Sequence, residues 1–196
     1  MNKLTIIGVT FLLILNIYLI FFYSNSNPIN NDIITVQLVA HIVDDNTVQF
    51  SSDRTEENIQ ELINEANRIW EPSNIKFNII STDTVQIDNR EFNSIFTGNV
   101  NTLMNKSKFV DGKINAYFAR YINANGVAFS PEDVFVVADL TSVNDFRTTA
   151  HELGHLLGLH HIQGRNNLMF KGSNGEILSQ SEINTARNNA RKKVII

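Results

Sequence analysis

The hydrophobic pattern opens with one long apolar run near the amino end. Residues 4–23 (LTIIGVTFLLILNIYLIFFY) carry no charge, and about twenty residues of helix span the ~30 Å core of a bilayer. This length favours an uncleaved membrane anchor over residues 1–23, followed by a polar linker at residues 24–31. A cleaved signal peptide is the alternative, with residues 24–26 (SNS) as a poor cleavage site. Both alternatives place the rest of the chain outside the cytoplasm, either anchored or, if residues 1–26 are removed, secreted.

Beyond this run, the pattern predicts one domain over residues 32–196 that mixes strands and helices. Apolar positions three and four apart predict an amphipathic helix over residues 54–70, capped by Asp53 and Glu56 and ended by Pro72. β-branched and alternating apolar runs predict strands at residues 33–43, 75–80, 84–87, 114–122 and 133–138. Further helices are predicted at residues 92–104, at residues 142–157 and from Ser179, with Ser179 and Glu182 as a capping pair. This order indicates an α+β fold, with one mixed sheet and helices packed on it.

The composition excludes several kinds of chemistry. The chain has no cysteine, so it contains no disulfide, thiolate ligand or cysteine nucleophile, and any metal site must use His, Asp, Glu or water. The formal net charge is -4, and the densest basic cluster is residues 191–193 (RKK). Nucleic acid is therefore not expected as a partner, and the domain is expected to be a monomer.

Four of the five histidines lie within the segment HELGHLLGLHH, residues 151–161. His151 and His155 are four residues apart, so they lie on the same side of the predicted helix, one turn apart. Their rings can converge on a point about 2 Å from each ring nitrogen, the distance of zinc–nitrogen bonds. Gly158 can end the helix in the left-handed conformation, and the chain reversal that follows lets His161 reach the same point.

Three neutral imidazoles leave the fourth position of a zinc ion open for water, as in catalytic sites. Glu152, beside His151, is then placed to take a proton from that water and to pass it to a leaving amine, while zinc polarises the carbonyl group under attack. His160 could compete for the metal, but the spacing from Gly158 favours His161. Chance occurrence on a surface helix is the alternative, and five fixed positions in register make it rare.

The spacing H-E-x-x-H-x-x-G-x-x-H resembles the zinc motif of the metzincin clan of metalloendopeptidases, and of its matrixin branch in particular. The clan has a methionine turn beneath the metal, and Met169 resembles that methionine, eight residues after His161. The resemblance implies an α+β metzincin-like catalytic domain with a mixed, mostly parallel sheet, an active-site helix, a methionine turn and a C-terminal helix. Astacins have a tyrosine ligand two residues after the methionine, where this chain has Lys171, so no tyrosine ligand is implied.

The resemblance also implies where substrate binds. In the family, a peptide runs antiparallel to an edge strand of the sheet, because an open edge offers unpaired N–H and C=O groups. The segment that resembles this edge strand consists of Gly126, Val127, Ala128 and Phe129. A plain hairpin without substrate contacts is the alternative.

Matrixins often bind further metal ions. His41 is the one histidine outside the motif, so a second, structural zinc site is not expected, and His41 is expected to be a hydrogen-bonded strand residue. Calcium stays an open alternative at loops near Asp111 and at residues 123–125, although the chain has no twelve-residue calcium loop.

These residues together predict a zinc-dependent endopeptidase that hydrolyses peptide bonds outside the cytoplasm, with a metal-bound water activated by Glu152. Two alternatives stay open: a catalytically silent metzincin-fold binding module, and a zinc hydrolase of non-peptide amides. The complete set of histidines and the presence of Glu152 argue against the silent module. The loop after Met169 (FKGSNGEI) does not indicate which peptide sequence is cleaved.

Overall fold

The structure is a computed structural model that describes residues 32–194. The expected membrane anchor at residues 1–23 and the linker at residues 24–31 lie outside the described residues. Within residues 32–194, no helix is both long enough and apolar enough to cross a bilayer.

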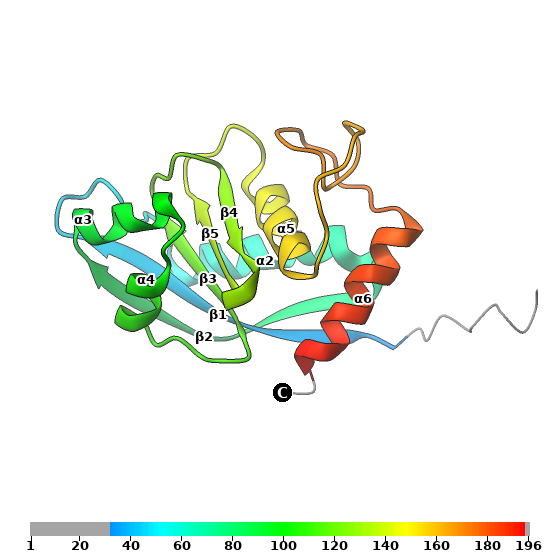
Figure 1. Ribbon diagram of the computed structural model, residues 1–196, viewed down its shortest axis with the longest axis horizontal. Helices are drawn as coiled ribbons and strands as arrows, with labels where there is room; N and C mark the ends of the chain where they lie inside the picture. Colours follow the sequence, from blue (N-terminus) through cyan, green and yellow to red (C-terminus); the bar gives the residue numbers. More distant parts are fainter. Residues whose placement is uncertain (1–31, 195–196) are drawn as a thin grey trace, which may run out of the picture. The chain divides into compact units, whose positions relative to one another are not determined.

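Five strands form one mixed sheet in the order β2-β1-β3-β5-β4 (Figure 1). Four of them are parallel: β1 (Ile34–Asp45), β2 (Ile75–Ile87), β3 (Ile114–Ala119) and β5 (Val134–Ala138). The short strand β4 (Gly126–Phe129) is antiparallel to β5 and lies at one end of this order. The predicted α+β fold with a mixed, mostly parallel sheet is confirmed.

One strand replaces the two that the sequence predicted between residues 75 and 87. The register of β2 against β1 shifts by one residue between Leu38 and Val39, so that Ile80 forms a bulge and the strand continues. The polar residues that suggested a break, 81–83, are exposed or half-buried on this outermost strand.

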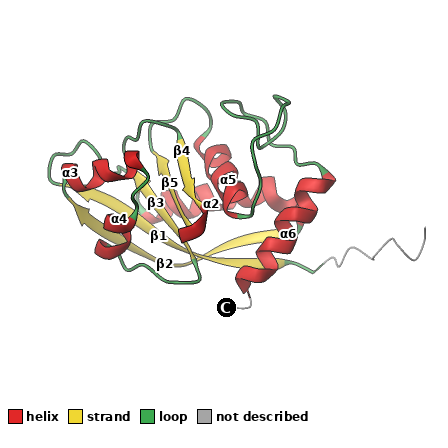
Figure 2. Cartoon of the chain, in the orientation of Figure 1, coloured by secondary structure: helices red, strands yellow, loops and turns green. Residues whose placement is uncertain are grey.

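Alternation along the strands sends side chains into two separate cores, one on each face of the sheet. Helices lie on both faces (Figure 2). On one face pack α2 (Glu56–Trp70), α5 (Asp145–Leu156) and α6 (Gln180–Val194). The other face is covered by α3 (Asn89–Phe92), the 3-10 helix η2 (Asn93–Thr97) and α4 (Asn101–Lys106). The candidate site belongs to the first face, because α5 carries it.

Two predictions about helix ends had different outcomes. The Asp53 and Glu56 cap is wrong: the capping pair of α2 is Thr55 and Asn58, whose side chains accept hydrogen bonds from each other's backbone N–H groups at 3.2 and 3.1 Å. Asp53 instead forms an ion pair with Arg120. The Ser179 and Glu182 pair at the start of α6 is confirmed by the same reciprocal bonds.

The helix predicted over residues 92–104 is not continuous. Gly98, with a φ of 82°, ends η2 in the left-handed conformation, and the chain starts α4 anew at Asn101. Phe92, Ile95 and Leu103 are nevertheless all buried, so the apolar spacing marked core positions correctly.

Candidate metal centre

The helix α5 is held on both sides, which fixes the histidines that it carries. It begins at Asp145, later than the predicted residue 142, and its residues 147–154 are all buried. Trp70 of α2 donates a hydrogen bond from Nε1 to the carbonyl oxygen of Ala150 at 3.2 Å. Gly154 packs so closely on Met169 that a Cβ atom at this position would lie 2.7 Å from the methionine sulfur.

The chain reverses directly after α5. Gly158 has a φ of 80°, and the N–H of Leu159 bonds the carbonyl of Gly154 while the N–H of Gly158 bonds that of His155, both at 2.9 Å. These two bonds form a Schellman motif. Asn189 of α6 donates a further hydrogen bond to the carbonyl of Leu157 at 3.0 Å. The reversal brings the segment after Gly158 back toward the helix.

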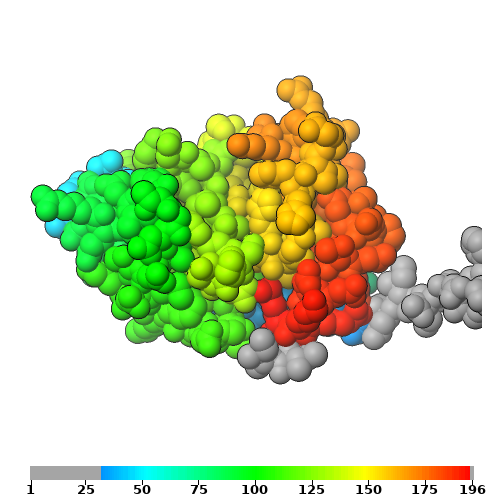
Figure 3. Space-filling view, in the orientation of Figure 1, coloured from blue at the N-terminus to red at the C-terminus, as the bar shows by residue number. Residues whose placement is uncertain are grey.

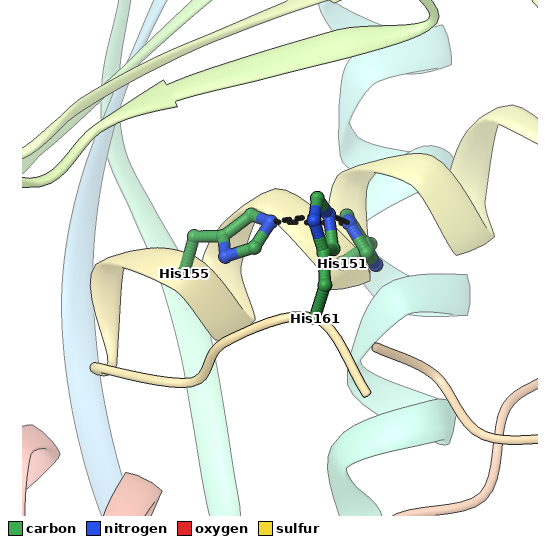
Figure 4. Close-up of side chains that lie close together, drawn as sticks. All are labelled: His151, His155 and His161. Carbon is green, nitrogen blue, oxygen red and sulfur yellow. Dashed lines mark hydrogen bonds between the residues drawn. The ribbon is translucent and has the colours of Figure 1, made fainter. Parts of the chain in front are cut away.

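Three imidazole rings converge at this point (Figure 4). The Nε2 atoms of His151, His155 and His161 lie 3.1 to 3.2 Å apart in every pair. Nitrogen atoms bound to one tetrahedral zinc ion at 2.0 to 2.1 Å are about 3.3 to 3.4 Å apart. The triangle therefore has nearly the dimensions of three ligands of a zinc ion.

Hydrogen bonds on the far side of two rings set their protonation. Nδ1 of His151 bonds the carbonyl oxygen of Leu168 at 2.7 Å, and Nδ1 of His155 bonds that of Leu159 at 2.9 Å. A carbonyl oxygen only accepts, so each Nδ1 carries the proton and each Nε2 presents a lone pair. Burial lowers the pKa of His151 to about 4 and also lowers the pKa of His155. Neutral rings with converging lone pairs repel one another unless a cation lies between them, so the donor set fits a divalent metal.

Glu152 lies beside the histidines and against the edge strand β4. It is 5% exposed, and burial raises the pKa of its carboxyl group to about 8, with Arg147 acting in the opposite direction. A Cβ atom at Gly126 would lie 2.8 Å from Cγ and from Oε1 of Glu152, so the carboxylate packs directly on the strand. A bound cation would favour the ionised form of this carboxyl group.

A cleft of about 1140 Å³ runs between α5 and β4. The three histidines and Glu152 line it, and β4 contributes Gly126, Val127 and Ala128. The segments of β4 and α5 lie next to each other on the face shown in Figure 3. Phe129, the last residue of β4, is half-buried and packs toward the core on the opposite face of the sheet.

Met169 is fully buried against Gly154 of α5. Its turn is held in place by two hydrogen bonds. The N–H of Met169 donates to Asn167 Oδ1 at 2.6 Å, and its carbonyl accepts from the N–H of Ile162 at 3.2 Å.

Two of the histidines lie apart from the triad. His160 is exposed and lines the cleft. His41 is fully buried on β1, where its Nδ1 contacts Asp83 and its Nε2 donates to Oδ1 of Asn115 at 3.1 Å. It is thus a hydrogen-bonded strand residue, as expected. Among residues 32–194, the triad is the one group of three or more His, Asp or Glu side chains close enough to hold a metal ion, and calcium binding stays a prediction.

The sequence did not reveal the groups that support the triad. These are the carbonyl oxygens of Leu159 and Leu168, and the buried side chain of Arg147, which bonds three backbone carbonyls of the loop after Leu168. Backbone groups carry no sequence signal. Arg147 does carry one: it is a charged residue four positions before His151, and so lies on the same side of the helix.

The fold and the histidine cluster together define a metzincin-type metallopeptidase domain. A model of the matrixin family matches residues 41–188, and the chain belongs to this family. Matrixins are zinc metalloproteases, so the chain is a hydrolase of this class.

Solved structures share the fold at low sequence identity. Archaemetzincin from Methanopyrus kandleri has a TM-score of 0.53 and 16% identity, over 84% of this chain and 99% of that one. Metalloproteinase-II from Bacteroides fragilis has a TM-score of 0.53 and 12% identity, over 80% of this chain and 53% of its own. A protein in a chaperone–substrate complex has a TM-score of 0.57 and 17% identity, over 84% of this chain and 39% of its own. No curated protein matches the sequence significantly.

Proposed function

We propose that the chain is a zinc-dependent endopeptidase in which His151, His155 and His161 hold the catalytic zinc and Glu152 is the general base. The observation that carries this proposal is the convergence of three Nε2 atoms within 3.1 to 3.2 Å of one another. Membership of the matrixin family supports zinc as the metal.

A zinc ion at this position would supply Lewis-acid chemistry, polarising the scissile carbonyl and lowering the pKa of a water molecule. The part of Glu152 is to take the proton of the attacking water and to return it to the leaving amine. Its burial against Gly126 holds the carboxylate at the wall of the cleft, so proton transfer needs little reorganisation. Met169 packs on Gly154, between His151 and His155 in the sequence, and so supports the part of α5 that carries both.

The strand β4 is the proposed binding surface for the peptide. One edge of β4 pairs with β5, and β4 is the last strand in the order of the sheet. The other edge lines the cleft beside the histidines, so an extended peptide can add to the sheet there and place a peptide bond above the triad. This geometry favours peptides over small amides, which gain nothing from an open strand edge.

Variants of two histidines in the motif test the metal site. His155→Ala removes one of the three converging nitrogens, so zinc affinity should fall by more than the roughly 100-fold that loss of an outer-shell partner costs. His160→Ala is the control, because this exposed ring lies outside the triad and its loss should leave zinc affinity unchanged. Metal analysis and chelator competition on the purified chain give the result. Equal zinc affinity of the parent and His155→Ala would remove His155 from the site.

Glu152→Gln tests the general base. The amide has nearly the same shape but cannot take a proton, so hydrolysis of casein should fall by about 10² to 10⁴-fold, the usual size of this effect. Zinc content measured on the same samples is the control and should match the parent. Equal hydrolysis by both zinc-loaded proteins would show that Glu152 is not the base. A zinc-loaded parent that hydrolyses nothing in a broad peptide library would favour a silent binding module.

We also propose that the catalytic domain acts outside the cytoplasm, tethered by residues 1–23. The support is the uncharged run of residues 4–23. Membrane fractionation should recover the full-length chain in the membrane pellet. Recovery of a soluble form that begins near Asn27 would instead mean that the segment is a cleaved signal peptide.

A further inference from the structure

Arg147 is a charged residue buried within the site, 3% exposed, and the catalytic roles proposed above do not use it. Its guanidinium group donates three hydrogen bonds to backbone carbonyls. Nη2 bonds the oxygens of Leu168 and Phe170, both at 2.5 Å, and Nε bonds the oxygen of Gly175 at 3.2 Å. The side chain thus ties α5 to both ends of residues 168–175, the loop that follows the methionine turn.

One of these carbonyls also bonds a histidine of the triad. The oxygen of Leu168 accepts from Arg147 Nη2 and, at 2.7 Å, from Nδ1 of His151. Arg147 and His151 are four residues apart on α5, on the same side of the helix. The guanidinium group of Arg147, the carbonyl of Leu168 and the imidazole of His151 are therefore linked in series. In this arrangement, the position of the Leu168 oxygen sets the orientation of the imidazole ring.

The loop also meets α5 at two other points: Met169 packs on Gly154, and Oδ1 of Asn174 accepts from the N–H of Asn144, the N-cap residue of α5, at 2.9 Å. The N–H of Leu168 donates to the carbonyl of Ile177 at 2.9 Å, and the N–H of Ile177 donates to the carbonyl of Asn166 at 3.0 Å. Both bonds join the two ends of the loop region to each other. Gly175 packs so tightly that a Cβ atom would lie 2.4 Å from the backbone of Asn166. The loop is thus closely packed on itself, and Arg147 makes three of the side-chain hydrogen bonds that join it to the helix with the histidines.

We infer that Arg147 is a positioning residue of the metal site: it holds the Leu168 carbonyl so that His151 keeps its proton on Nδ1 and its Nε2 lone pair on the metal. This inference rests on the proposed role of His151 as a ligand. Lysine cannot replace the arginine, because a single ammonium group cannot reach three carbonyls in the geometry of the planar fork.

Zinc affinity of the full-length chain tests the inference, with a second ion-paired arginine, Arg54, as the matched control. Arg54 is also largely buried and bridges Asp139 and Asp145 at 2.9 and 2.8 Å, but it makes no bond to the loop or the triad. Arg147→Met should weaken zinc binding by about 10 to 100-fold, as loss of an outer-shell partner does. Arg54→Met should lower the unfolding temperature and leave zinc affinity unchanged.

Chelator competition gives both affinities without any assay of hydrolysis. Unchanged zinc affinity in Arg147→Met, or an equal loss in Arg54→Met, would overturn the inference. Failure of the parent to bind zinc would instead overturn the proposed metal site, so the two failures are distinguishable.

A second measurement covers the case in which Arg147→Met does not fold. Arg147→Lys keeps the positive charge and loses the three-way hydrogen bonding, so it should fold and still bind zinc more weakly than the parent. In the metal-free protein, ¹⁵N spectra of the imidazoles should show His151 protonated on Nδ1 in the parent and as a mixture of tautomers in Arg147→Lys. Identical His151 spectra in both would contradict the inference.

Discussion

At the scale of single residues, the site depends on small contacts as much as on its histidines. Gly126 is the example: its backbone needs no left-handed conformation, but its missing side chain leaves room for Glu152. A Cβ atom there would lie 2.8 Å from Oε1 of Glu152 and 2.9 Å from Cγ2 of Thr148. The sequence predicted Gly126 as part of an edge strand, whereas the structure adds a reason for glycine at this position.

Gly126→Val should therefore displace the carboxylate of Glu152. Overpacking of this kind costs typically 1 to 3 kcal/mol of stability, and the turnover number should fall more than KM rises, because the general base moves. The matched experiment repeats the substitution in a Glu152→Ala background, where the close contact with Glu152 is gone and only the contact with Thr148 remains. Urea unfolding should show that Gly126→Val loses less stability in that background than in the parent. An equal loss in both backgrounds would mean that Glu152 is not what the new side chain meets.

At the scale of elements, the sequence predicted what local spacing determines and missed what tertiary contacts determine. The four-residue interval between His151 and His155 was enough to place both rings on one side of α5, and Gly158 marked the reversal that returns His161. The bulge at Ile80 was missed, since it depends on pairing with β1. The break at Gly98 was also missed, although a glycine is a local sign of a helix end. The roles of the histidines and of Glu152 stay predictions, because geometry alone does not show a metal or a reaction.

The reversal after α5 makes a prediction of its own. Gly158→Ala places a side chain in the left-handed region, which costs about 1 to 2 kcal/mol, and its Cβ atom would lie 2.5 Å from Nδ2 of Asn189. The turn should shift, and zinc affinity should fall because His161 moves with it.

Gly98→Ala is the matched control for this substitution. Its φ of 82° is nearly the same as the 80° of Gly158, but a Cβ atom there meets nothing within 4 Å. This variant should be destabilised by the left-handed conformation to a similar extent as Gly158→Ala. It should bind zinc as tightly as the parent. Thermal unfolding and chelator competition on both variants separate the two effects. Unchanged zinc affinity in Gly158→Ala would show that the turn does not position His161.

At the scale of the whole molecule, two helical layers bury the sheet and leave β4 free on one edge. The helix α5 can carry buried ionisable groups because α2, the sheet and the methionine turn all pack on it. That burial holds the metal-free site in uncharged forms: it lowers the pKa of His151 to about 4 and raises that of Glu152 to about 8. The stability of the metal-free chain should therefore depend on pH.

The sign of that dependence follows from Glu152. Between its ordinary pKa of 4.5 and its folded pKa of about 8, the folded state holds a proton that the unfolded state has lost, so stability falls as pH rises through this range. From pH 7 to 8.5 this contribution amounts to about 1 kcal/mol.

The buried histidines act in the opposite sense, since their folded pKa values are lowered, but they act equally in Glu152→Gln. In urea unfolding, the free energy of unfolding of the metal-free parent should therefore fall by about 1 kcal/mol more over this range than that of Glu152→Gln. Zinc should abolish the difference, because a cation beside the carboxyl group keeps it ionised. Equal pH dependence of the two metal-free chains would mean that Glu152 is already ionised without the metal.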